Sequence, residues 1–212
     1  MEKKIKLHLF ALVAVSLLGM LVLSFSCAPT TAPAPATSVQ VQASASNTKI
    51  RRIAVMDFEY KAQSYYPRSD LVALAQISER SIENGGEIIT DAFMQAMMQT
   101  AKYQIIERSN LAKVVNELKL SASGLTSAEL NQLGQLLQID GLVFGKVNYF
   151  SEQNTAGVVK KFKVSISVRL VDVKTGNVVW TASDEMAAGG GSPVKAAQAI
   201  CSRVAGKIAA NP

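Results

Sequence analysis

Histidine is nearly absent from the 212-residue sequence, because the single histidine, His8, lies in an apolar stretch at the N-terminus. If that stretch is removed during export, the mature chain has no imidazole group. The lack of histidine excludes Ser-His and Cys-His nucleophilic catalysis, together with nearly all zinc and haem sites. No other catalytic constellation stands out along the chain. We therefore expect that the protein is not an enzyme and uses no cofactor, metal ion or small-molecule substrate.

Cysteine is also scarce, with only Cys27 and Cys201 in the sequence. If Cys27 is modified, an internal disulfide bond is impossible. Cys201 lies in a predicted helix beside Ile200 and Val204, which is typical of a small buried apolar side chain. A reactive thiol needs a basic neighbour, and Arg203 is the one candidate nearby. We interpret Cys201 as a core residue.

The excess of positive charge is small. The formal net charge is +6, from 22 basic and 16 acidic residues. Removal of residues 1–26 takes away Lys3, Lys4, Lys6 and Glu2, which leaves 19 basic and 15 acidic residues and a net charge of +4. These charges are spread along the chain, whereas proteins that bind nucleic acids concentrate basic residues on one surface. Nucleic acid is therefore not an expected partner.

Residues 1–26 have the organisation of an export signal, with lysines followed by the apolar stretch Leu7–Phe25. A transmembrane anchor is the alternative interpretation, because 19 apolar residues nearly span a bilayer. The stretch, however, ends in a sequence that resembles a bacterial lipobox, with the small residue Ser26 before Cys27. The resemblance implies cleavage and lipidation at Cys27. Ala28 stands where retention at the inner membrane would call for aspartate, so the outer membrane is the expected location.

Residues 27–48 follow as the lipidated cysteine and a tether rich in proline, alanine, threonine and serine. Nothing apolar repeats in this segment, so we expect no packed structure there. The folded part is predicted as a single domain over residues 49–212. Its length suits one hydrophobic core.

Residues 85–111 predict a helix, a buried strand and the start of a second helix, around which the other elements would pack. The buried face of the first helix is expected to hold Ile89, Phe93, Ala96, Met97 and Thr100. Tyr103–Glu107 has the composition of a strand. Ser109 is a suitable N-cap for the second helix, whose apolar residues are Leu111, Val114, Val115 and Leu118.

Further elements are predicted on either side of this unit. Before it, a buried strand is expected at Ile50–Tyr60 and a helix at Leu71–Glu83. After it, Thr126 to Glu129 forms a capping box for a helix that carries Leu130, Leu133, Leu136 and Leu137. The C-terminal half then predicts a strand at 142–150, a polar loop at 151–157, a strand at 162–170, a hairpin turn at 174–177 and a strand at 178–185.

The last predicted helix has Ser192 as its N-cap and Pro193 at its first position. Its buried face is expected to hold Val194, Ala197, Cys201, Val204 and Ile208. The order of elements indicates the α/β (α+β) class, with a mixed β-sheet of about five strands and helices packed against it.

Several local patterns have a structural interpretation that we prefer to a functional one. Gly141–Lys146 is one residue too short for a phosphate loop and lies in a predicted strand. Asp57 and Glu59 share a strand face, where solvated side chains are more usual than an acid–base pair. Met94, Met97 and Met98 are interpreted as core residues. Glu107-Arg108 is expected to pair with neighbouring charges, and Gly189–Gly191 to form a plain loop.

Four stretches in consistent order resemble the CsgG family, the curli production assembly and transport proteins. They are Ile53–Glu59, Tyr103–Leu111, Ile139–Gly145 and Val168–Gly176. The resemblance implies a lipid-anchored protein at the periplasmic face of the outer membrane. Because characterised relatives form rings that export amyloid subunits, it also implies assembly with copies of itself or docking on other envelope proteins.

In ring-forming relatives, a Tyr-Pro-x-Ser run in a loop after the first strand narrows the pore. The corresponding residues here are Tyr66, Pro67, Arg68 and Ser69, preceded by Tyr65. The resemblance implies that these five residues form a constriction or interaction loop. The next two residues, Asp70-Leu71, replace the Asn-Phe of the family.

An alternative reading is an outer-membrane lipoprotein that activates a periplasmic peptidoglycan synthase, because such regulators have a similar α/β domain.

Overall fold

A computed structural model describes residues 40–43, 49–62, 77–120, 124–155 and 159–210 of the chain. Four helices and eight strands lie in these residues. In chain order they are β1 (Gln40–Ala43), β2 (Arg52–Val55), β3 (Glu59–Tyr60), β4 (Ile77–Ser81), α3 (Gly85–Thr100), β5 (Gln104–Ile105), α4 (Arg108–Glu117), α5 (Ser127–Leu137), β6 (Gly141–Thr155), β7 (Val159–Asp172), β8 (Val178–Gly189) and α6 (Pro193–Ala210).

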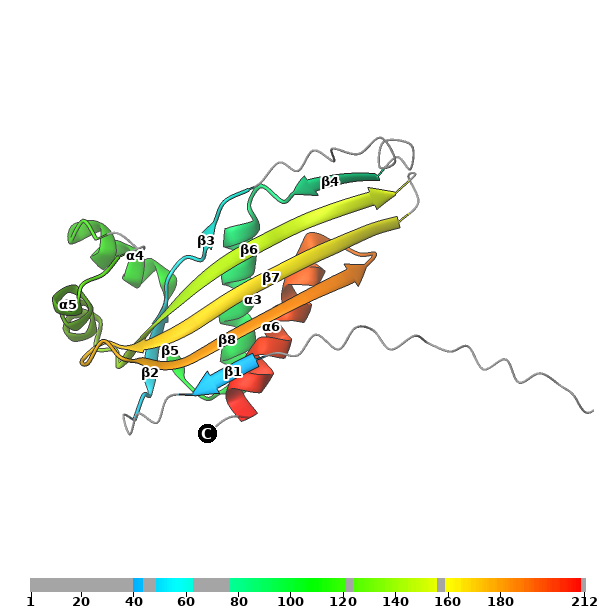
Figure 1. The fold of residues 1–212 in the computed structure, drawn as a ribbon. Coiled ribbons are helices and arrows are strands. Elements are labelled where there is room, and N and C mark those ends of the chain that lie inside the picture. Colours follow the sequence, from blue (N-terminus) through cyan, green and yellow to red (C-terminus); the bar gives the residue numbers. More distant parts are fainter. Residues whose placement is uncertain (1–39, 44–48, 63–76, 121–123, 156–158, 211–212) are drawn as a thin grey trace, which may run out of the picture. The chain divides into compact units, whose positions relative to one another are not determined.

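The single mixed sheet is organised around β6 (Figure 1). On one side, β6 pairs with β7 in an antiparallel ladder, and β8 and β1 continue the sheet in that direction. On its other side, β6 pairs in succession with three short strands: β2 and β3 in parallel, then β4 antiparallel. The expected α/β (α+β) class with a mixed sheet is confirmed, and the described residues form eight strands where about five were expected.

Helices α3 and α6 pack together on one face of the sheet and enclose the larger core (Figure 1). Ile89, Phe93 and Met97 of α3 are fully buried, as their helical spacing predicted. The centres of the Phe93 and Phe58 rings lie 5.3 Å apart. Gly145 of β6 faces Phe58 so closely that no Cβ would fit there, which explains the glycine at a central strand position.

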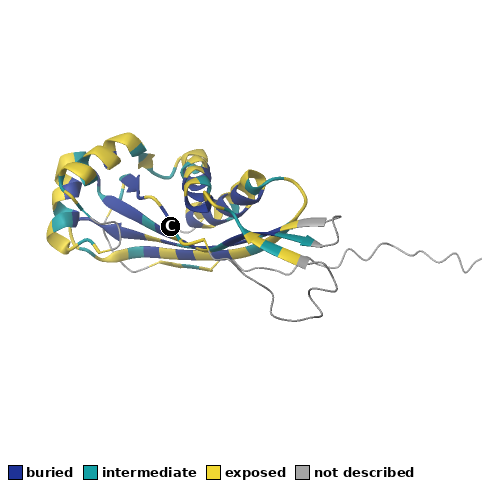
Figure 2. Ribbon diagram, turned by 90° about the horizontal axis from the view of Figure 1, so that it is seen from above, coloured by how far each residue is buried: buried dark blue, intermediate teal, exposed yellow. Residues whose placement is uncertain are grey.

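The opposite face of the sheet is covered at one end only, by α4 and α5. The second core there consists of Ala54, Met56, Leu111, Leu130, Leu133, Ile139, Leu142, Val171 and Val173. Because residues 53–56 and 142–143 are buried on both faces, their apolar runs are nearly continuous. Figure 2 shows the buried residues gathered where the helices meet the sheet, with exposed residues on the outer helix surfaces.

Local signals at three element boundaries are confirmed. Thr126 and Glu129 form the predicted capping box of α5, with reciprocal side-chain to backbone bonds. The turn after β7 joins it to β8 as a hairpin. The Ser192 hydroxyl accepts a hydrogen bond from the backbone N–H of Lys195 at 3.3 Å, so it caps α6.

Several sequence-based boundaries are wrong. The polar residues 151–155, expected in a loop, continue β6, because β4 and β7 supply backbone partners on both sides. Residues 77–81, expected in a helix, form β4 for the same reason. The strand expected over 50–60 is divided into β2 and β3, with Phe58 turned into the core between them. The strand expected over 103–107 is reduced to β5.

Other corrections concern helix ends and single side chains. Helix α4 begins at Arg108 with Glu107 as its N-cap, so Ser109 lies inside the helix. Three apolar residues expected in the core are exposed instead, namely Met98, Leu136 and Val194. Residues 40–43, expected within the tether, form the edge strand β1 on β8, where the backbone of β8 provides a pairing partner. In the described part of the chain, no helix combines the length and apolarity needed to cross a membrane.

Candidate interaction surfaces

Arg108, at the start of α4, joins three elements by ion pairs. Its Nε lies 2.6 Å from Asp57 Oδ1 in the connection between β2 and β3, and its Nη1 lies 2.7 Å from Asp91 Oδ1 on α3. Partial burial lowers the pKa of Arg108, but the hydrogen bond and charge of Asp57 and the charges of Asp91 and Glu87 outweigh it and raise the pKa. The expectation that Arg108 pairs with neighbouring charges is confirmed. Both carboxylates are largely exposed, so these pairs orient the elements more than they stabilise them.

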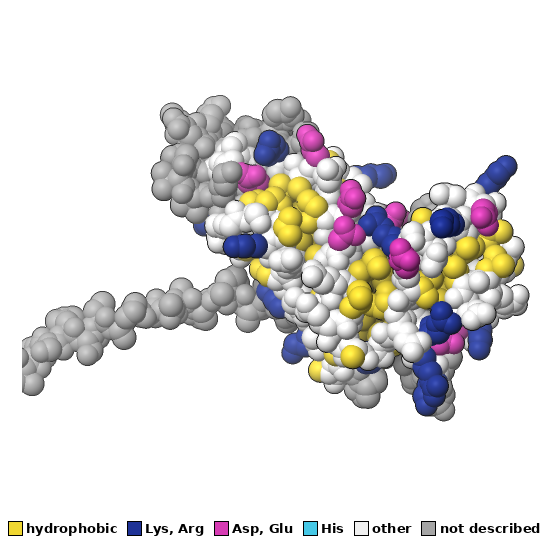
Figure 3. All heavy atoms as spheres, turned by 180° about the vertical axis from the view of Figure 1, so that it is seen from behind, with side chains coloured by type: hydrophobic (Ala, Val, Ile, Leu, Met, Phe, Trp, Pro, Cys, Tyr) yellow, Lys and Arg dark blue, Asp and Glu magenta, His cyan; other side chains and the backbone are white. Residues whose placement is uncertain are grey.

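An apolar groove lies between α3 and α4, beside this charged cluster. We call it the α3–α4 groove; its volume is about 440 Å³ and it is lined by Asp91, Met94, Gln95, Met98, Ile105, Ile106, Glu107 and Arg108. Met98 is 64% exposed, so it is not the core residue that the sequence suggested. Figure 3 shows the hydrophobic surface in the centre of this side, next to acidic and basic groups. Exposed methionines on an apolar surface are suited to contact with a partner.

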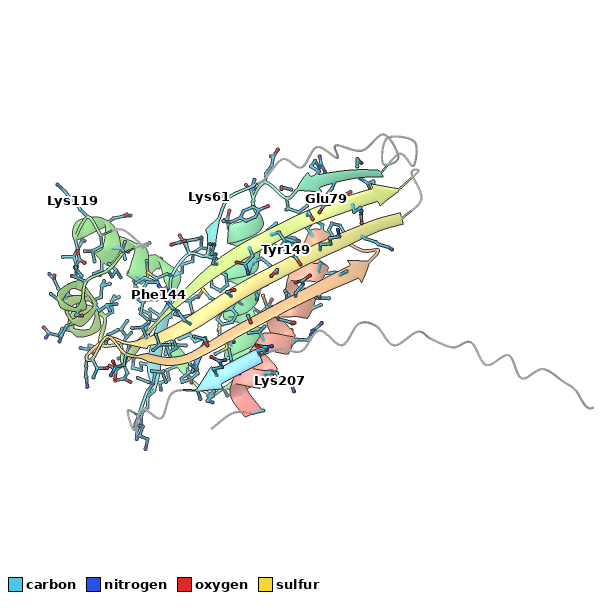
Figure 4. The ribbon with its side chains drawn as sticks, viewed as in Figure 1. Lys61, Glu79, Lys119, Phe144, Tyr149 and Lys207 are labelled. Atoms are coloured by element: carbon cyan, nitrogen blue, oxygen red, sulfur yellow. The ribbon has the colours of Figure 1, made fainter. Side chains whose placement is uncertain are left out.

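Among the described residues, no helix covers the sheet face that carries Phe144 beyond α4 and α5, and we call this part the open face (Figure 4). Its polar side chains alternate with buried ones along β6 and β7, as expected for an antiparallel sheet with one solvated face. Asn148 donates hydrogen bonds to the hydroxyls of Ser165 and Ser167, at 3.2 and 3.0 Å. The Arg169 guanidinium lies 5.1 Å from the centre of the Phe144 ring.

A shallow pocket of about 440 Å³ lies on the open face and extends from β1 across β8, β7 and β6 to Asp57 and Glu59. Its lining includes polar groups from five strands and connections: Gln40, Gln42, Asp57, Glu59, Lys146, Ser167, Arg169, Thr181 and Ser183. Two cations and two carboxylates therefore face one pocket, together with neutral hydroxyl and amide groups. Such a lining offers hydrogen bonds of both kinds and no dominant charge, which suits a polar peptide or protein surface better than a phosphate or a metal ion.

At the far end of the open face, Tyr149 lies next to acidic residues (Figure 4). Burial raises the pKa of its hydroxyl, and the hydrogen bond to Glu185 and the charges of Glu185 and Glu79 raise it further. Glu79 in turn accepts a hydrogen bond from Ser151 at 2.6 Å and lies 3.8 Å from the Lys163 ammonium. A tyrosine with a raised pKa stays protonated and acts as a hydrogen-bond donor, not as a base.

The residues considered for chemistry occupy structural positions. Cys201 is fully buried, and burial raises the pKa of its thiol to about 12, so it is a core residue as expected. Its thiol lies 3.7 Å from the carbonyl oxygen of Ile89. Asp57 and Glu59 are both exposed, and Asp57 is held by Arg108. In the residues with described positions, no group of three or more His, Cys, Asp or Glu side chains could hold a metal ion.

Sequence reasoning missed one buried ion pair. Arg203 of α6 donates a hydrogen bond of 2.9 Å to Asp184 Oδ1 on β8, and the Asp184 side chain is completely buried. Burial raises the pKa of Asp184, and the charge of Arg203 opposes this effect. The available signal was the alternation in β8, which places Asp184 on the same face as Trp180 and Ala182. Arg203 therefore serves this carboxylate and not the Cys201 thiol.

The remaining predicted sites lie outside the described residues. They are the lipidation site Cys27 and the loop residues Tyr65, Tyr66, Pro67, Arg68 and Ser69. The segment that contains the loop is bounded by β3 and β4, and both of these strands pair with β6. Those residues stay predictions of the sequence.

Comparisons with known proteins identify a family. A sequence profile of the family described as "Curli production assembly/transport component CsgG" matches residues 34–192. This match covers β1 to β8 and ends just before α6. A search of curated protein sequences found no significant match.

Solved structures resemble the fold at low sequence identity. Lipoprotein GNA1162 from Neisseria meningitidis is 17% identical, with a TM-score of 0.50 over 76% of this chain and 99% of that one. The PelC dodecamer from Paraburkholderia phytofirmans gives 14% identity and a TM-score of 0.46 over 79% and 94% of the two chains. The LpoB C-terminal domain from Escherichia coli gives 13% and 0.41 over 67% and 87%. At these identities the likeness concerns the fold alone.

Proposed function

Because the chain belongs to the CsgG family of curli production assembly/transport components, we propose that it is a lipoprotein of the bacterial outer membrane. In this proposal Cys27 carries the lipid and the domain lies at the periplasmic face of the membrane. There the domain acts as a component of a secretion or cell-envelope assembly complex, in contact with copies of itself and with other envelope proteins.

One observation carries the proposal: a sequence that resembles a lipoprotein signal directly precedes the family domain. The match to the family begins at residue 34, seven residues after Cys27, and continues to residue 192. Residues 7–25 form the apolar stretch of the signal, and Ser26 is the small residue expected before the cleavage site. A family domain in this position is joined to the membrane by a short connection.

We propose further that the protein works by contact and not by catalysis. The only histidine of the sequence is His8, in the signal. The surfaces available for contact are the α3–α4 groove, with its exposed Met98, and the polar open face of the sheet. Both suit protein partners, while nucleic acids and small-molecule substrates would need a concentrated charge or a deep site.

The anchor is tested by lipid labelling of cells that express the full chain. Cys27→Ala should abolish incorporation of a labelled fatty acid and release the protein from the membrane fraction. Cys201→Ala is the matched control, because it removes the other cysteine from the core and should leave labelling unchanged. Density-gradient separation of the membranes then shows whether the labelled protein follows the outer membrane. Undiminished labelling of Cys27→Ala would contradict the proposal.

The assembly is tested by the mass of the lipidated protein after extraction in detergent. Self-assembly predicts a mass of several chains, measured by light scattering with the detergent contribution subtracted. A single-chain mass would contradict self-assembly. Such a result, together with binding to a peptidoglycan synthase, would support the alternative function of a synthase activator.

The segment with Tyr65, Tyr66, Pro67, Arg68 and Ser69 is proposed as a contact loop of the assembly. Replacement of Tyr66 by alanine should impair export or partner binding in cells, while the amount of anchored protein stays unchanged. Equal activity of the variant and the wild type would remove this loop from the proposal.

A further inference from the structure

The outer side of α3 carries a stripe with a charged half and an apolar half. Glu87, Asp91, Met94, Gln95 and Met98 recur at helical spacing along it, so they lie one above another. Glu87 and Asp91 are acidic, and α3 contains no lysine or arginine, although Arg108 of α4 pairs with Asp91. The two methionines follow towards the C-terminal end and form one wall of the α3–α4 groove. This stripe therefore changes from acidic to apolar along the helix.

The outer side of α6 has the complementary order. Lys195 is exposed in its first turn, and the small residues Ala199, Ser202 and Gly206 are exposed in the turns that follow. The helix contains Lys195, Arg203 and Lys207 and has no acidic residue. Its outer stripe thus changes from basic to small and flat, in the same direction in which α3 changes from acidic to apolar.

Gly206 indicates that something approaches α6 closely from outside. A glycine in a helix interior costs about 1 kcal/mol relative to alanine. Apart from its chain neighbours and the backbone of α6 itself, no heavy atom of the described residues lies within 4 Å of the place where its Cβ would be. The described structure of one copy therefore gives no packing reason for the glycine. The close approach of another helix would give one, since small residues let helix backbones come near each other.

The two helices also have suitable directions. They pack side by side and both run from the top of the view to the bottom (Figure 1). A rotation about an axis along these helices keeps their direction, so α6 of one copy would lie parallel to α3 of the next. Parallel alignment brings the basic end of α6 to the acidic end of α3, and the small residues to the methionines.

We propose that α6 of one copy docks in the α3–α4 groove of a second copy, in a head-to-tail contact. Lys195 lies against Glu87 and Asp91, and the surface around Ser202 and Gly206 packs on Met94 and Met98. The inference rests on the self-assembly in the proposed function and names its surfaces. Helix α6 lies beyond the residues that match the family.

A head-to-tail contact is favoured over a symmetric one by charge. With a two-fold axis along the helices, two α3 stripes would bring Glu87 and Asp91 of both copies together, and two α6 stripes would do the same with Lys195; like charges in such positions oppose association. With a two-fold axis across the helices, the charged end of each stripe would face the uncharged end of the other and meet no opposite charge. Because the two surfaces differ and lie on different parts of the chain, repetition of the contact adds copies, and a ring forms where the rotation between neighbours closes.

The first experiment places a large side chain at position 206, where a single copy leaves open space beside α6. Gly206→Leu in the full, lipidated chain should leave the circular dichroism spectrum unchanged and lower the mass in detergent to that of one chain. Gln132→Leu, on the exposed side of α5, is the matched control and should keep the wild-type mass. Unchanged assembly of Gly206→Leu would overturn the proposal.

The second experiment exchanges charges. Lys195→Glu and Glu87→Lys should each raise the protein concentration at half-assembly by about tenfold, and the double variant should restore it to within about threefold. Restoration distinguishes a direct contact from a fold defect in either variant. Two additive losses would overturn the proposal.

The third experiment uses cross-linking between copies. Oxidation of the double variant Gln95→Cys/Ser202→Cys should give a ladder of dimers, trimers and longer chains, while each single variant stays uncrosslinked. Dimers from Gln95→Cys alone would show a symmetric contact and overturn the proposal. If the wild type has the mass of several chains and the double variant gives no ladder, the proposed surfaces are wrong while self-assembly stands. If the wild type has the mass of one chain, the assembly itself is refuted.

Discussion

In the part of the chain that the structure describes, the sheet face that carries Phe144 is covered at one end and bare at the other. At the covered end, α4 and α5 pack on Ala54, Leu142 and Val171, and the sheet is buried on both faces. At the bare end, the same face holds Lys146, Ser167 and other polar groups, and only the face under α3 and α6 is buried. The strands at the covered end are therefore held by two cores, whereas the bare end keeps a face free for contact.

The largest loss of stability is expected from a substitution in the larger core, between the sheet and helices α3 and α6. Phe93→Ala removes a fully buried ring between α3 and the sheet, so it should lower the free energy of unfolding by about 3–5 kcal/mol. Urea unfolding followed by circular dichroism measures the change. A loss below about 1 kcal/mol would mean that the ring makes few of the contacts described for it.

The covered end has its own, smaller core, which a substitution in α5 tests separately. Leu133 is fully buried, so Leu133→Ala should cost about 2–4 kcal/mol. Leu136→Ala, one turn further along the same helix, is the matched control, because Leu136 is 57% exposed and its loss should stay within about 0.5 kcal/mol. Equal effects of the two substitutions would argue against the second core.

The ion pair between Asp184 and Arg203, under α6, should make the stability of the domain depend on pH. Burial raises the pKa of Asp184 in the folded state, so the folded state holds this proton more tightly than the unfolded state. Stability from this group is therefore present at low pH and is lost as the pH rises from the ordinary value of about 4 through the raised pKa.

Asp184→Asn removes the titrating group and tests this dependence. The stability of the wild type relative to the variant should fall as the pH is raised above about 4. Urea midpoints measured at several pH values give the difference. A constant or rising difference would show that the carboxylate is not destabilised by burial.

The smallest effect is expected on the open face. Arg169→Ala removes the contact with the Phe144 ring at an exposed position, and should cost about 0.5–1 kcal/mol. Arg169→Lys keeps the charge and should recover part of this loss. A cost above about 2 kcal/mol would mean that the arginine supports the sheet more than a solvated side chain does.

The sequence predicted the elements whose signals are local. The buried stripe of α3, the capping box at Thr126, the hairpin after β7 and the capped start of α6 all follow from spacing within a few residues. The near-continuous apolar runs also indicated where the sheet is buried on both faces. These features placed the fold in the correct class.

Features that depend on distant partners could not be predicted in this way. Residues 151–155 and 77–81 are too polar to look like strands, and they pair because each completes the ladder of the other. Met98 was assigned to the core from its side-chain type, but its helical position puts it on the side of α3 opposite Ile89, away from the sheet. The α3–α4 groove is made by α3, β5 and α4 together, so no single stretch of sequence shows it.

Strand β1 also changes how far the domain can stand from a membrane. If the chain were free from Cys27 to the start of the domain at residue 49, those 22 steps could stretch to about 75 Å. Pairing of Gln40 with Ser183 of β8 stops the free length at 13 steps, or about 45 Å at full extension. With the proposed anchor, the pairing of β1 with β8 thus shortens the greatest distance at which this edge of the sheet can lie from the bilayer.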